Sequence, residues 1–253
     1  MIRGHSTSHL YWVRERCLSD TFPPVEDALE DPDGLLAIGG ELSPARLVEA
    51  YQSGIFPWYS EGQPYLWWSP SERAVLHPSS VKVSRSLAKS IRNRGYKLSF
   101  DKAFSEVIAA CAQAREAHGG TWITQEMRAA YIALHASGQT HSVECWLNGR
   151  LVGGLYGVAL GRVFFGESMF SHERDASKVA FVALCRMLNS WSYQMLDCQM
   201  PTPHLSSLGA QPATRHAYMQ VLRREVSTEP AATAWRGDNN VFLTDPGPVN
   251  VQP

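Results

Sequence analysis

Two polar residues in the C-terminal part of the chain could act together on an amine. Asp197 and Gln199 stand two positions apart in MLDCQM at 195–200, whose apolar character predicts a short strand. Side chains two positions apart on a strand project from one face, so we expect the carboxylate and the amide to be neighbours. The alternative is an acid that ends a strand and a solvated glutamine, and the spacing alone leaves it open.

Glu167 is a third residue whose type and position suit chemistry. It follows the apolar stretch VFFG at 163–166, which predicts a strand. A carboxylate there could pair with an ammonium or a guanidinium group, and charge-assisted hydrogen bonds of this kind give both affinity and selection. An ordinary surface glutamate at a turn is the alternative.

Residues 1–72 predict a small unit ahead of these candidates. A short strand, LLAI, lies in a turn-rich segment. A helix follows over 43–54, with Ser43 as its N-cap, Pro44 in its first turn and Gly54 at its end. The segment 54–73 predicts an aromatic loop that joins two units, and we place a domain boundary near residue 72. Its aromatic residues are Phe56, Trp58, Tyr59, Tyr65, Trp67 and Trp68.

Residues 73–226 predict a larger α+β unit that contains all three candidates. The stretch from His141 to Phe170 predicts three antiparallel strands, with a tight turn at Asn148-Gly149. The order of helices and strands is similar to the acetyltransferase-like α/β fold, the GNAT fold. Residues 227–253 contain four prolines and predict a loose tail. Helical spacing recurs in five segments, which are 82–97, from Asp101, from Thr124 to Gly138, 177–191 and 214–226.

Composition limits the class of protein. The chain has 253 residues, of which 44% are hydrophobic and 19% charged, which is typical of a globular protein of one or two domains. A formal net charge of -1 excludes a protein that coats nucleic acid by bulk charge, but it permits a local basic face. No apolar run reaches the roughly 18 residues that cross a bilayer, and the charged N-terminus is not typical of a signal peptide.

The pattern of the five cysteines also indicates the redox state of the compartment in which the protein lies. They include no CxxC motif, and the sequence has no cluster with the spacing of metal ligands. We therefore expect a reduced, cytoplasmic protein without a disulfide framework, a metal ion or another cofactor.

An ordered set of short motifs resembles one family, the leucyl/phenylalanyl-tRNA–protein transferases. The similarity runs from about residue 22 to residue 226, and the ordered set is far more specific than any single motif. The motifs are GLLAIGGELSPARLVEAYQSGIFPWYS at 34–60, LWWSP at 66–70, SRSL at 84–87, GTWIT at 120–124, LVGGLYGV at 151–158, FGESMFS at 165–171, ASK at 176–178, LDCQ at 196–199 and HLSSLGA at 204–210.

This resemblance implies a function and a fold. Members transfer Leu, Phe or Met from charged tRNA to the N-terminal Arg or Lys of an acceptor protein, and so mark that protein for degradation by the bacterial N-degron pathway. They have a small N-terminal domain followed by a GNAT-like domain. The implied partners are aminoacyl-tRNA and acceptor proteins, with no membrane, and we expect a monomer.

The resemblance also implies roles for individual residues. Asp197 and Gln199 match the catalytic pair of the family, and Glu167 matches a residue that contacts substrate. Our hypothesis is that the Gln199 oxygen orients the acceptor amine while Asp197 fixes the orientation of the amide. The donor side-chain pocket of the family matches a set of apolar residues that ordinary core packing would also explain, namely Leu155, Phe164, Met169, Phe181 and Leu184.

Two further groups match the parts of the family that hold tRNA. Trp58 and Trp122 match tryptophans that bind the terminal adenosine, and aromatic faces stack on bases. Arg85, Lys89 and Arg92 fall on one helical face in 82–97, a stretch with six Lys or Arg residues and no acid. Such a face could follow tRNA phosphates without reading bases, and a solvated helix face is the alternative.

Three other functions stay open on the sequence. An acetyl-CoA-dependent N-acetyltransferase would carry a glycine-rich pyrophosphate loop, whereas SHERDASKVAF at 171–181 has no glycine. A non-catalytic RNA-binding module would not need the three candidate residues together. A relative that transfers other amino acids, for example to Glu or Asp N-ends, would be expected to lack the set GIFPW, GESMF and LDCQ.

Overall fold

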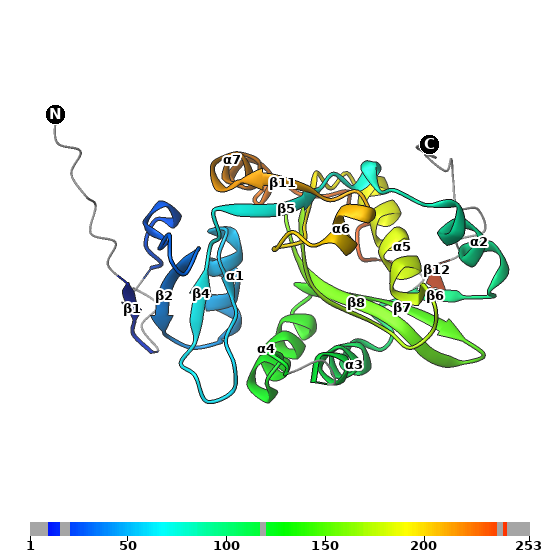
Figure 1. The fold of residues 1–253 in the computed structure, drawn as a ribbon, viewed down its shortest axis with the longest axis horizontal. Helices are drawn as coiled ribbons and strands as arrows, with labels where there is room; N and C mark the ends of the chain where they lie inside the picture. Colours follow the sequence, from blue (N-terminus) through cyan, green and yellow to red (C-terminus); the bar gives the residue numbers. More distant parts are fainter. Residues whose placement is uncertain (1–9, 16–20, 117–119, 237–239, 242–253) are drawn as a thin grey trace.

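The computed structural model describes residues 10–15, 21–116, 120–236 and 240–241, and it contains two β-sheets with helices around them (Figure 1). A small N-terminal sheet of four strands lies beside a larger sheet of eight strands. The expectation of a mixed α/β protein with a small N-terminal unit is therefore confirmed. None of the helices in the described part of the chain is both long and apolar enough to cross a bilayer.

The N-terminal sheet packs against one short helix. Its helix, α1 (Pro44–Gln52), begins as predicted, because the Ser43 hydroxyl accepts a hydrogen bond from the backbone N–H of Arg46 at 3.3 Å. The aromatic segment was predicted to be a loop, and this is wrong for two short stretches that pair as strands. The strand order is β1 (Tyr11–Val13), β2 (Leu35–Gly39), β4 (Leu66–Trp68) and β3 (Phe56–Pro57).

The larger sheet contains the predicted meander. The turn at Asn148-Gly149 has φ values of 52° and 75°, which a two-residue hairpin of type I′ requires. Only β9 and β10 run parallel among the paired strands of this sheet. In spatial order its strands are β11 (Gln211–Thr214), β5 (Glu72–Leu76), β10 (Met195–Asp197), β9 (Val163–Ser171), β8 (Arg150–Leu160), β7 (Thr140–Leu147), β6 (Lys97–Phe100) and β12 (Asn240–Val241).

Helices cover both faces of the larger sheet. On one face lie α3 (Phe104–Glu116) and α4 (Gln125–Ala136), and their predicted apolar residues are buried in one core with the N-terminal unit. On the other face lies α5 (Ala176–Ser190), with α2 (Arg85–Asn93) packed beside it around a second core. The remaining helices are the short α6 (Pro203–Ser207), which was not predicted, and α7 (Arg215–Glu225).

The strands β4 and β5 belong to different sheets although only three residues separate them. The backbone therefore passes from the N-terminal sheet to the larger sheet over residues 69–71. The boundary near residue 72, with units over 1–72 and 73–226, stays a prediction.

The C-terminal segment is not loose over its described part, so that expectation is wrong for residues 227–236. The Trp235 ring stacks on His141, with centroids 3.8 Å apart, and its Nε1–H donates to the Tyr193 hydroxyl at 2.8 Å. It also lies against the rings of Phe100 and Trp191. The segment is ordered although most of its residues are small or polar. The packing of the Trp235 ring offsets the entropy that is lost when the segment is ordered. Residues 237–239 and 242–253 of the predicted tail lie outside the described residues.

Replacing Trp235 by Ala should therefore destabilise the protein by roughly 2 kcal/mol, since a ring packed against four others is lost. Chemical denaturation measures this change. The control is Trp12→Ala, because the Trp12 side chain is 71% exposed and its loss should cost much less. Equal stability of the two variants would contradict the packing role of the C-terminal segment.

Candidate active site

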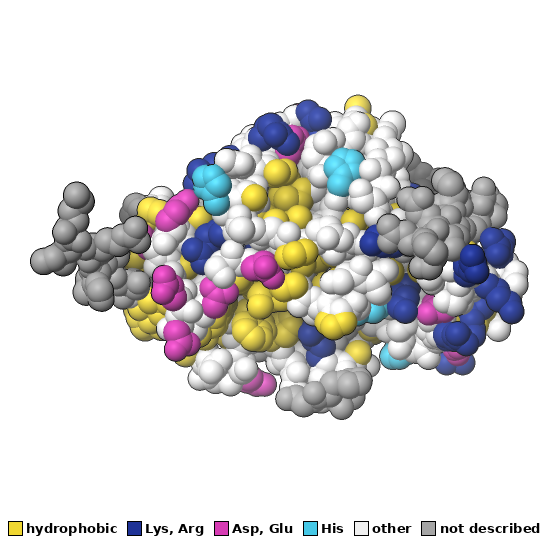
Figure 2. Space-filling model, turned by 45° about the horizontal axis from the view of Figure 1, so that its top comes forward, with side chains coloured by type: hydrophobic (Ala, Val, Ile, Leu, Met, Phe, Trp, Pro, Cys, Tyr) yellow, Lys and Arg dark blue, Asp and Glu magenta, His cyan; other side chains and the backbone are white. Residues whose placement is uncertain are grey.

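A large cavity opens between the N-terminal unit and the edge of the meander. Its volume is about 1170 Å³, and its walls come from the aromatic segment after α1, from the end of α3 and from strands β8, β9 and β10. Space-filling shows hydrophobic side chains gathered near the middle of one face, with acidic side chains beside them (Figure 2). The cavity contains two of the three candidate residues, Glu167 and Gln199.

Glu167 lies at a β-bulge in the wall of the cavity. The pairing of β8 with β9 passes from Tyr156–Ser168 to Gly157–Gly166, so Glu167 has no partner on β8. The extra residue reverses the alternation of side chains along β9. Phe165 lies in the core with α1 and α3, whereas Met169, four positions later, packs on the core of α5. Bulges often re-aim a side chain next to an active site, and this one brings Met169 to the α5 side of the sheet.

Three donors converge on the Glu167 carboxylate. Its Oε1 accepts hydrogen bonds from the Tyr51 hydroxyl at 2.7 Å and from the Gln199 amide Nε2 at 2.7 Å. Its Oε2 accepts a hydrogen bond from the Tyr131 hydroxyl at 3.0 Å. The two tyrosine oxygens also lie close together, but each hydroxyl has one proton, and both protons are donated to Glu167 in this arrangement. These donors come from α1, α4 and the segment after β10, so three distant parts of the chain meet at one side chain.

Burial sets the proton affinity of this carboxyl group. Glu167 is 6% exposed, and burial raises its pKa to about 7, while the hydrogen bonds from Tyr51 and Tyr131 act in the opposite direction. A carboxyl group with a pKa near neutrality can take up and release a proton under physiological conditions. Glu167 is therefore not the exposed turn residue that the sequence left as an alternative.

The Gln199 side chain is oriented by Glu167. A carboxylate only accepts hydrogen bonds, so the amide must present its NH₂ group to Glu167, which leaves the Gln199 oxygen for another partner. Gln199 lies beyond the end of β10 and has a φ of 61°, in the left-handed region. The expectation that Asp197 and Gln199 project together from one strand is therefore wrong, because the strand ends at Asp197.

Asp197 acts on the backbone of Gln199 and not on its side chain. Its Oδ1 accepts a hydrogen bond from the Gln199 backbone N–H at 2.8 Å. Its Oδ2 accepts hydrogen bonds from the Arg73 guanidinium and from the Tyr218 hydroxyl. Asp197 is fully buried and does not line the cavity. Asp197 stabilises the left-handed backbone conformation that directs the Gln199 side chain toward Glu167. Among the described residues, the expected contact between the Asp197 carboxylate and the Gln199 side-chain amide is absent.

Arg73, on β5, holds the charge of Asp197. The guanidinium lies between the rings of Phe56 and Tyr218, with its central carbon 4.7 Å from each ring centroid. Arg73 is 1% exposed, so both members of this ion pair are out of water. A buried ion pair requires both partners, because removal of one leaves an uncompensated charge.

The structure brings four of the five predicted pocket residues to the cavity wall, namely Leu155, Met169, Phe181 and Leu184. The fifth, Phe164, does not line the cavity. It lies in the core around α5, and its ring is 5.7 Å from that of Trp235. Phe164 and Met169 both lie on the α5 side of the sheet, because the bulge between them reverses the alternation, and of the two Met169 lines the cavity.

Both predicted tryptophans line the cavity. Trp58 is 49% exposed, and its backbone oxygen accepts a hydrogen bond from the Trp68 indole N–H at 2.7 Å. Trp122 is half-buried, and the Arg115 guanidinium lies over its ring. Trp67 is fully buried, whereas Trp68 reaches the cavity.

The predicted basic face lies away from the cavity. Arg85, Lys89 and Arg92 are exposed on α2, while Leu87 and Ile91 on the same helix are buried. Dark-blue side chains gather at the right-hand end of the molecule, where Figure 1 places α2 (Figure 2). The helix and its two faces are therefore as expected, and its ligand stays a prediction.

Several residues of the site gave no signal in the sequence. Tyr51 and Tyr131 have the spacing of core residues on α1 and α4, and Arg73 stands in a segment that predicted a domain boundary. Arg115 lies at the end of an amphipathic helix and resembles an ordinary C-terminal basic residue. Only contacts between distant segments identify these residues.

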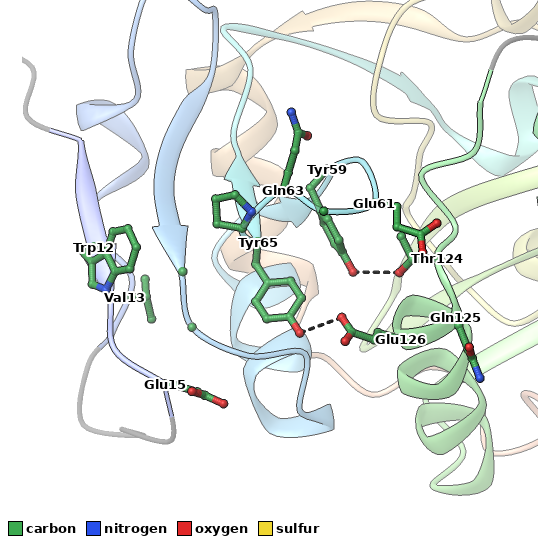
Figure 3. Close-up of a pocket in the computed structure, with 14 residues that line it drawn as sticks. Trp12, Val13, Glu15, Tyr59, Glu61, Gln63, Tyr65, Thr124, Gln125 and Glu126 are labelled. Atoms are coloured by element: carbon green, nitrogen blue, oxygen red, sulfur yellow. Dashed lines mark hydrogen bonds between the residues drawn. The ribbon is translucent and has the colours of Figure 1, made fainter.

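A second, smaller cavity of about 760 Å³ lies across the loop between β3 and β4 (Figure 3). Two hydrogen bonds in it join the N-terminal unit to α4. The Tyr59 hydroxyl bonds to the Thr124 hydroxyl at 3.0 Å, and the Tyr65 hydroxyl donates to the Glu126 carboxylate at 2.9 Å. These bonds hold the aromatic segment that carries Trp58. Among the described residues, no group of three or more His, Cys, Asp or Glu side chains could hold a metal ion.

The chain matches two family models. The model described as leucyl/phenylalanyl-tRNA protein transferase matches residues 75–223, and the model of the N-terminal domain of that family matches residues 40–71. A protein of Stutzerimonas stutzeri (strain A1501), named leucyl/phenylalanyl-tRNA–protein transferase, is 54% identical over 90% of this chain and 99% of its own. A protein of Aromatoleum aromaticum with the same name is 56% identical over 85% of this chain and 90% of its own.

The fold, the buried carboxylate and these matches define an aminoacyltransferase. The chain belongs to the leucyl/phenylalanyl-tRNA–protein transferase family, as the motifs had implied. Among solved structures, L-PGS from Bacillus licheniformis is similar at 10% identity, with a TM-score of 0.41 over 76% of this chain and 73% of its own. A score this low does not assign a shared fold.

The buried ion pair predicts the effect of changing Asp197. Asp197→Asn should destabilise the protein by about 3–5 kcal/mol, because it leaves the Arg73 charge buried without a partner. Chemical denaturation measures this loss. Tyr218→Phe is the control, because it removes one hydrogen bond and keeps the ion pair, and about 1 kcal/mol is expected. An Asn variant as stable as the wild type would show that the ion pair of Asp197 with Arg73 does not stabilise the fold.

Proposed function

We propose that this protein transfers Leu, Phe or Met from charged tRNA to the N-terminal Arg or Lys of an acceptor protein, and so marks that protein for degradation. The observation that carries the proposal is the buried Glu167–Gln199 pair at the wall of a cavity that is apolar on one side and acidic on another. The matched relatives are named for this activity.

A GNAT-like arrangement of the larger unit supports the proposal. Helices precede a three-stranded meander, and α5 then leads into β10, which pairs in parallel with β9. In this arrangement the cavity forms where β10 ends and β9 continues, which places Gln199, after β10, next to Glu167 on β9. We infer that the larger unit is GNAT-like on this order and pairing.

The apolar part of the cavity suits the donor side chain. Leu155, Met169, Phe181 and Leu184 line it from the meander and α5. An apolar slot separates Leu, Phe and Met only weakly, since a methylene group is worth about 1–3 kcal/mol, and it excludes polar side chains by their desolvation. Broad use of the three apolar amino acids follows from this chemistry.

The acidic part of the cavity suits a basic acceptor. The lining residues include the carboxyl groups of Glu61, Glu116 and Glu167, and Arg115 is the one Lys or Arg side chain among the described lining residues. This surplus of carboxylates attracts an ammonium or guanidinium group and repels an acidic N-end. It favours Arg or Lys over Glu or Asp as the first residue of the acceptor.

The reaction is the aminolysis of an ester. A free α-amino group has a pKa of about 7.7–8.0, so at neutral pH the acceptor enters largely as an ammonium and must lose a proton before it attacks. We assign the uptake of this proton to the Glu167 carboxylate, whose pKa of about 7 lies close to that of the amine. The Gln199 oxygen accepts a second N–H of the same amine and directs its lone pair at the carbonyl carbon.

The bond changes balance without a further reactant. The amine nitrogen bonds to the ester carbonyl carbon, and the bond from that carbon to the ribose oxygen breaks. Of the two protons left on the nitrogen, one goes to the ribose oxygen and the other stays as the N–H of the new peptide bond, and Glu167 releases its proton to water. The ester is already activated, so the alignment of two bound substrates can supply about 7–11 kcal/mol of the barrier. Trp58 and Trp122 would hold the adenosine, with stacking worth about 1–3 kcal/mol per base.

An acetyl-CoA-dependent reaction is disfavoured by the start of α5. That helix begins after Asp175, which has a φ of 63°, and the segment ahead of it contains no glycine to cradle a pyrophosphate. The exposed basic face of α2 instead offers three charges to a larger polyanion, and we propose that it contacts the tRNA backbone.

One assay tests the function. Purified protein is incubated with Leu-, Phe- and Met-tRNA and with peptides that begin with Arg, Lys or Glu. We expect transfer from all three donors to the Arg and Lys peptides and none to the Glu peptide. Transfer of an acetyl group from acetyl-CoA, or binding of tRNA without transfer, would overturn the proposal.

Glu167→Gln should lower kcat/KM for an Arg peptide by about 10²–10⁴-fold at neutral pH, because the proton acceptor is lost. The wild-type rate should rise with pH through about 7, as Glu167 becomes a carboxylate, and then level off, because the free amine present above about pH 8 attacks without first losing a proton. The variant depends on free amine, so its rate should rise with pH through about 8 and not fall. Parallel profiles would contradict the role of Glu167.

The same variant reports whether Glu167 has the raised pKa. A carboxyl group whose pKa is higher in the folded protein stabilises the fold at low pH, and this contribution is lost as pH rises through about 7. From pH 5 to pH 8 the wild type should therefore lose stability relative to Glu167→Gln by on the order of 2 kcal/mol.

A further inference from the structure

Arg115 is held at the cavity by two contacts that fix its direction. It lies in the last turn of α3, with its guanidinium carbon 5.4 Å from the centroid of the Trp122 ring. Its Nε–H donates to the Ser168 hydroxyl at 3.0 Å, and Ser168 is buried directly after Glu167. A guanidinium held by its Nε and by one face has little rotational freedom left.

The terminal nitrogens of Arg115 are available to a ligand. Within the described part of the chain, the hydrogen bond from Arg115 goes through Nε, and no other side chain or carbonyl is bonded to its two Nη groups. The side chain is exposed and lines the cavity. The Nη groups of an arginine form a planar fork that matches two oxygens of a phosphate.

The charge of the cavity creates a need for this group. Glu61, Glu116 and Glu167 all line it, so the phosphates next to the terminal adenosine would enter an acidic environment. Arg115 is the one full positive charge among the described lining residues, and it stands against the tryptophan that would hold the base. A base held at Trp122 therefore lies within reach of the guanidinium. One ribose separates the base of a nucleotide from its 5′ phosphate.

We propose that Arg115 forms a phosphate subsite, in which its Nη groups bind the phosphodiester on the 5′ side of the terminal adenosine while Trp122 holds the base. This inference rests on the proposed use of a tRNA donor. Inside the cavity, Arg115 alone would neutralise the phosphate backbone of the donor. The basic face of α2 is separate from this subsite, because it lies at the far end of the larger unit.

Binding of two small probes tests the subsite without any transfer reaction. Adenosine and adenosine 5′-monophosphate differ only in the phosphate, and their dissociation constants are measured by fluorescence titration. The wild type should bind the monophosphate about tenfold more tightly than adenosine, which is the usual effect of one charge-assisted hydrogen-bonded pair. Arg115→Gln should abolish this difference and leave adenosine binding unchanged.

Control variants separate the phosphate subsite from a packing role. Arg115→Lys keeps the charge without the fork and should keep part of the preference for the monophosphate, while Trp122→Ala should weaken both probes equally. Arg150→Gln removes another exposed arginine, at the start of β8, and should change neither probe. Thermal denaturation of each variant checks that it is folded.

Kinetics with three donors extend the test to the reaction. The donors are Phe-tRNA, phenylalanyl-adenosine and phenylalanyl-adenosine 5′-monophosphate. Arg115→Gln should raise KM about tenfold for the two donors that carry a phosphate and leave kcat and the nucleoside donor unchanged. Replacing Arg85, Lys89 and Arg92 together by Gln should raise KM for Phe-tRNA alone.

Two results would overturn the subsite. One is a wild type that binds adenosine and its monophosphate equally, and the other is an Arg115→Gln variant that weakens both probes to the same extent, which would make Arg115 a support for Trp122. Absence of transfer from every aminoacyl-tRNA, with the preference for the monophosphate intact, would instead overturn the proposed function.

Discussion

The site depends on a carboxylate that is kept out of water. Glu167 is almost fully buried, yet its three donors come from α1, α4 and the segment after β10, so the charge is tolerated only where these parts meet. Taking a carboxylate out of water is costly, and the cost appears as a pKa near 7. The ionised Glu167 side chain thus destabilises the fold, but it is well suited to accepting the proton of an amine. The N-terminal unit contributes directly, since Tyr51 belongs to it and makes the shorter of the two tyrosine contacts.

A second buried charge positions the partner of that carboxylate. Arg73 and Asp197 form an ion pair between two aromatic rings, and the free oxygen of Asp197 fixes the backbone of Gln199 in a left-handed turn. Asp197 therefore acts through geometry, as a positioning residue. Gln199 receives its orientation from two carboxylates, one that fixes its backbone and one that fixes its amide. This division explains how a neutral amide, which is a weak base, can still be placed to direct an amine.

The cavity combines surfaces of opposite character at short range. Apolar residues of the meander and α5 form one side, three glutamates form another, and Arg115 stands beside Trp122. The proposed donor has an apolar side chain and a charged backbone, whereas the proposed acceptor has a basic first residue. These groups need different surroundings, and the cavity offers a separate surface for each. The aromatic segment between α1 and β5 closes the cavity from the N-terminal side, and hydrogen bonds from Tyr59 and Tyr65 to α4 hold it in place.

The sequence by itself determined the local elements. The cap at Ser43, the hairpin at Asn148-Gly149 and the two faces of α2 were all predicted, because they depend on neighbours within a few positions. Its motifs also identified the family and brought Glu167 and Gln199 to attention. The tertiary structure decided what these residues touch. The bulge at Glu167, the pairing of Asp197 with Arg73 124 positions away, and the packing of Trp235 follow from contacts between segments far apart in the chain. Periodicity and spacing do not report such contacts, because they describe only the order of residues along the chain.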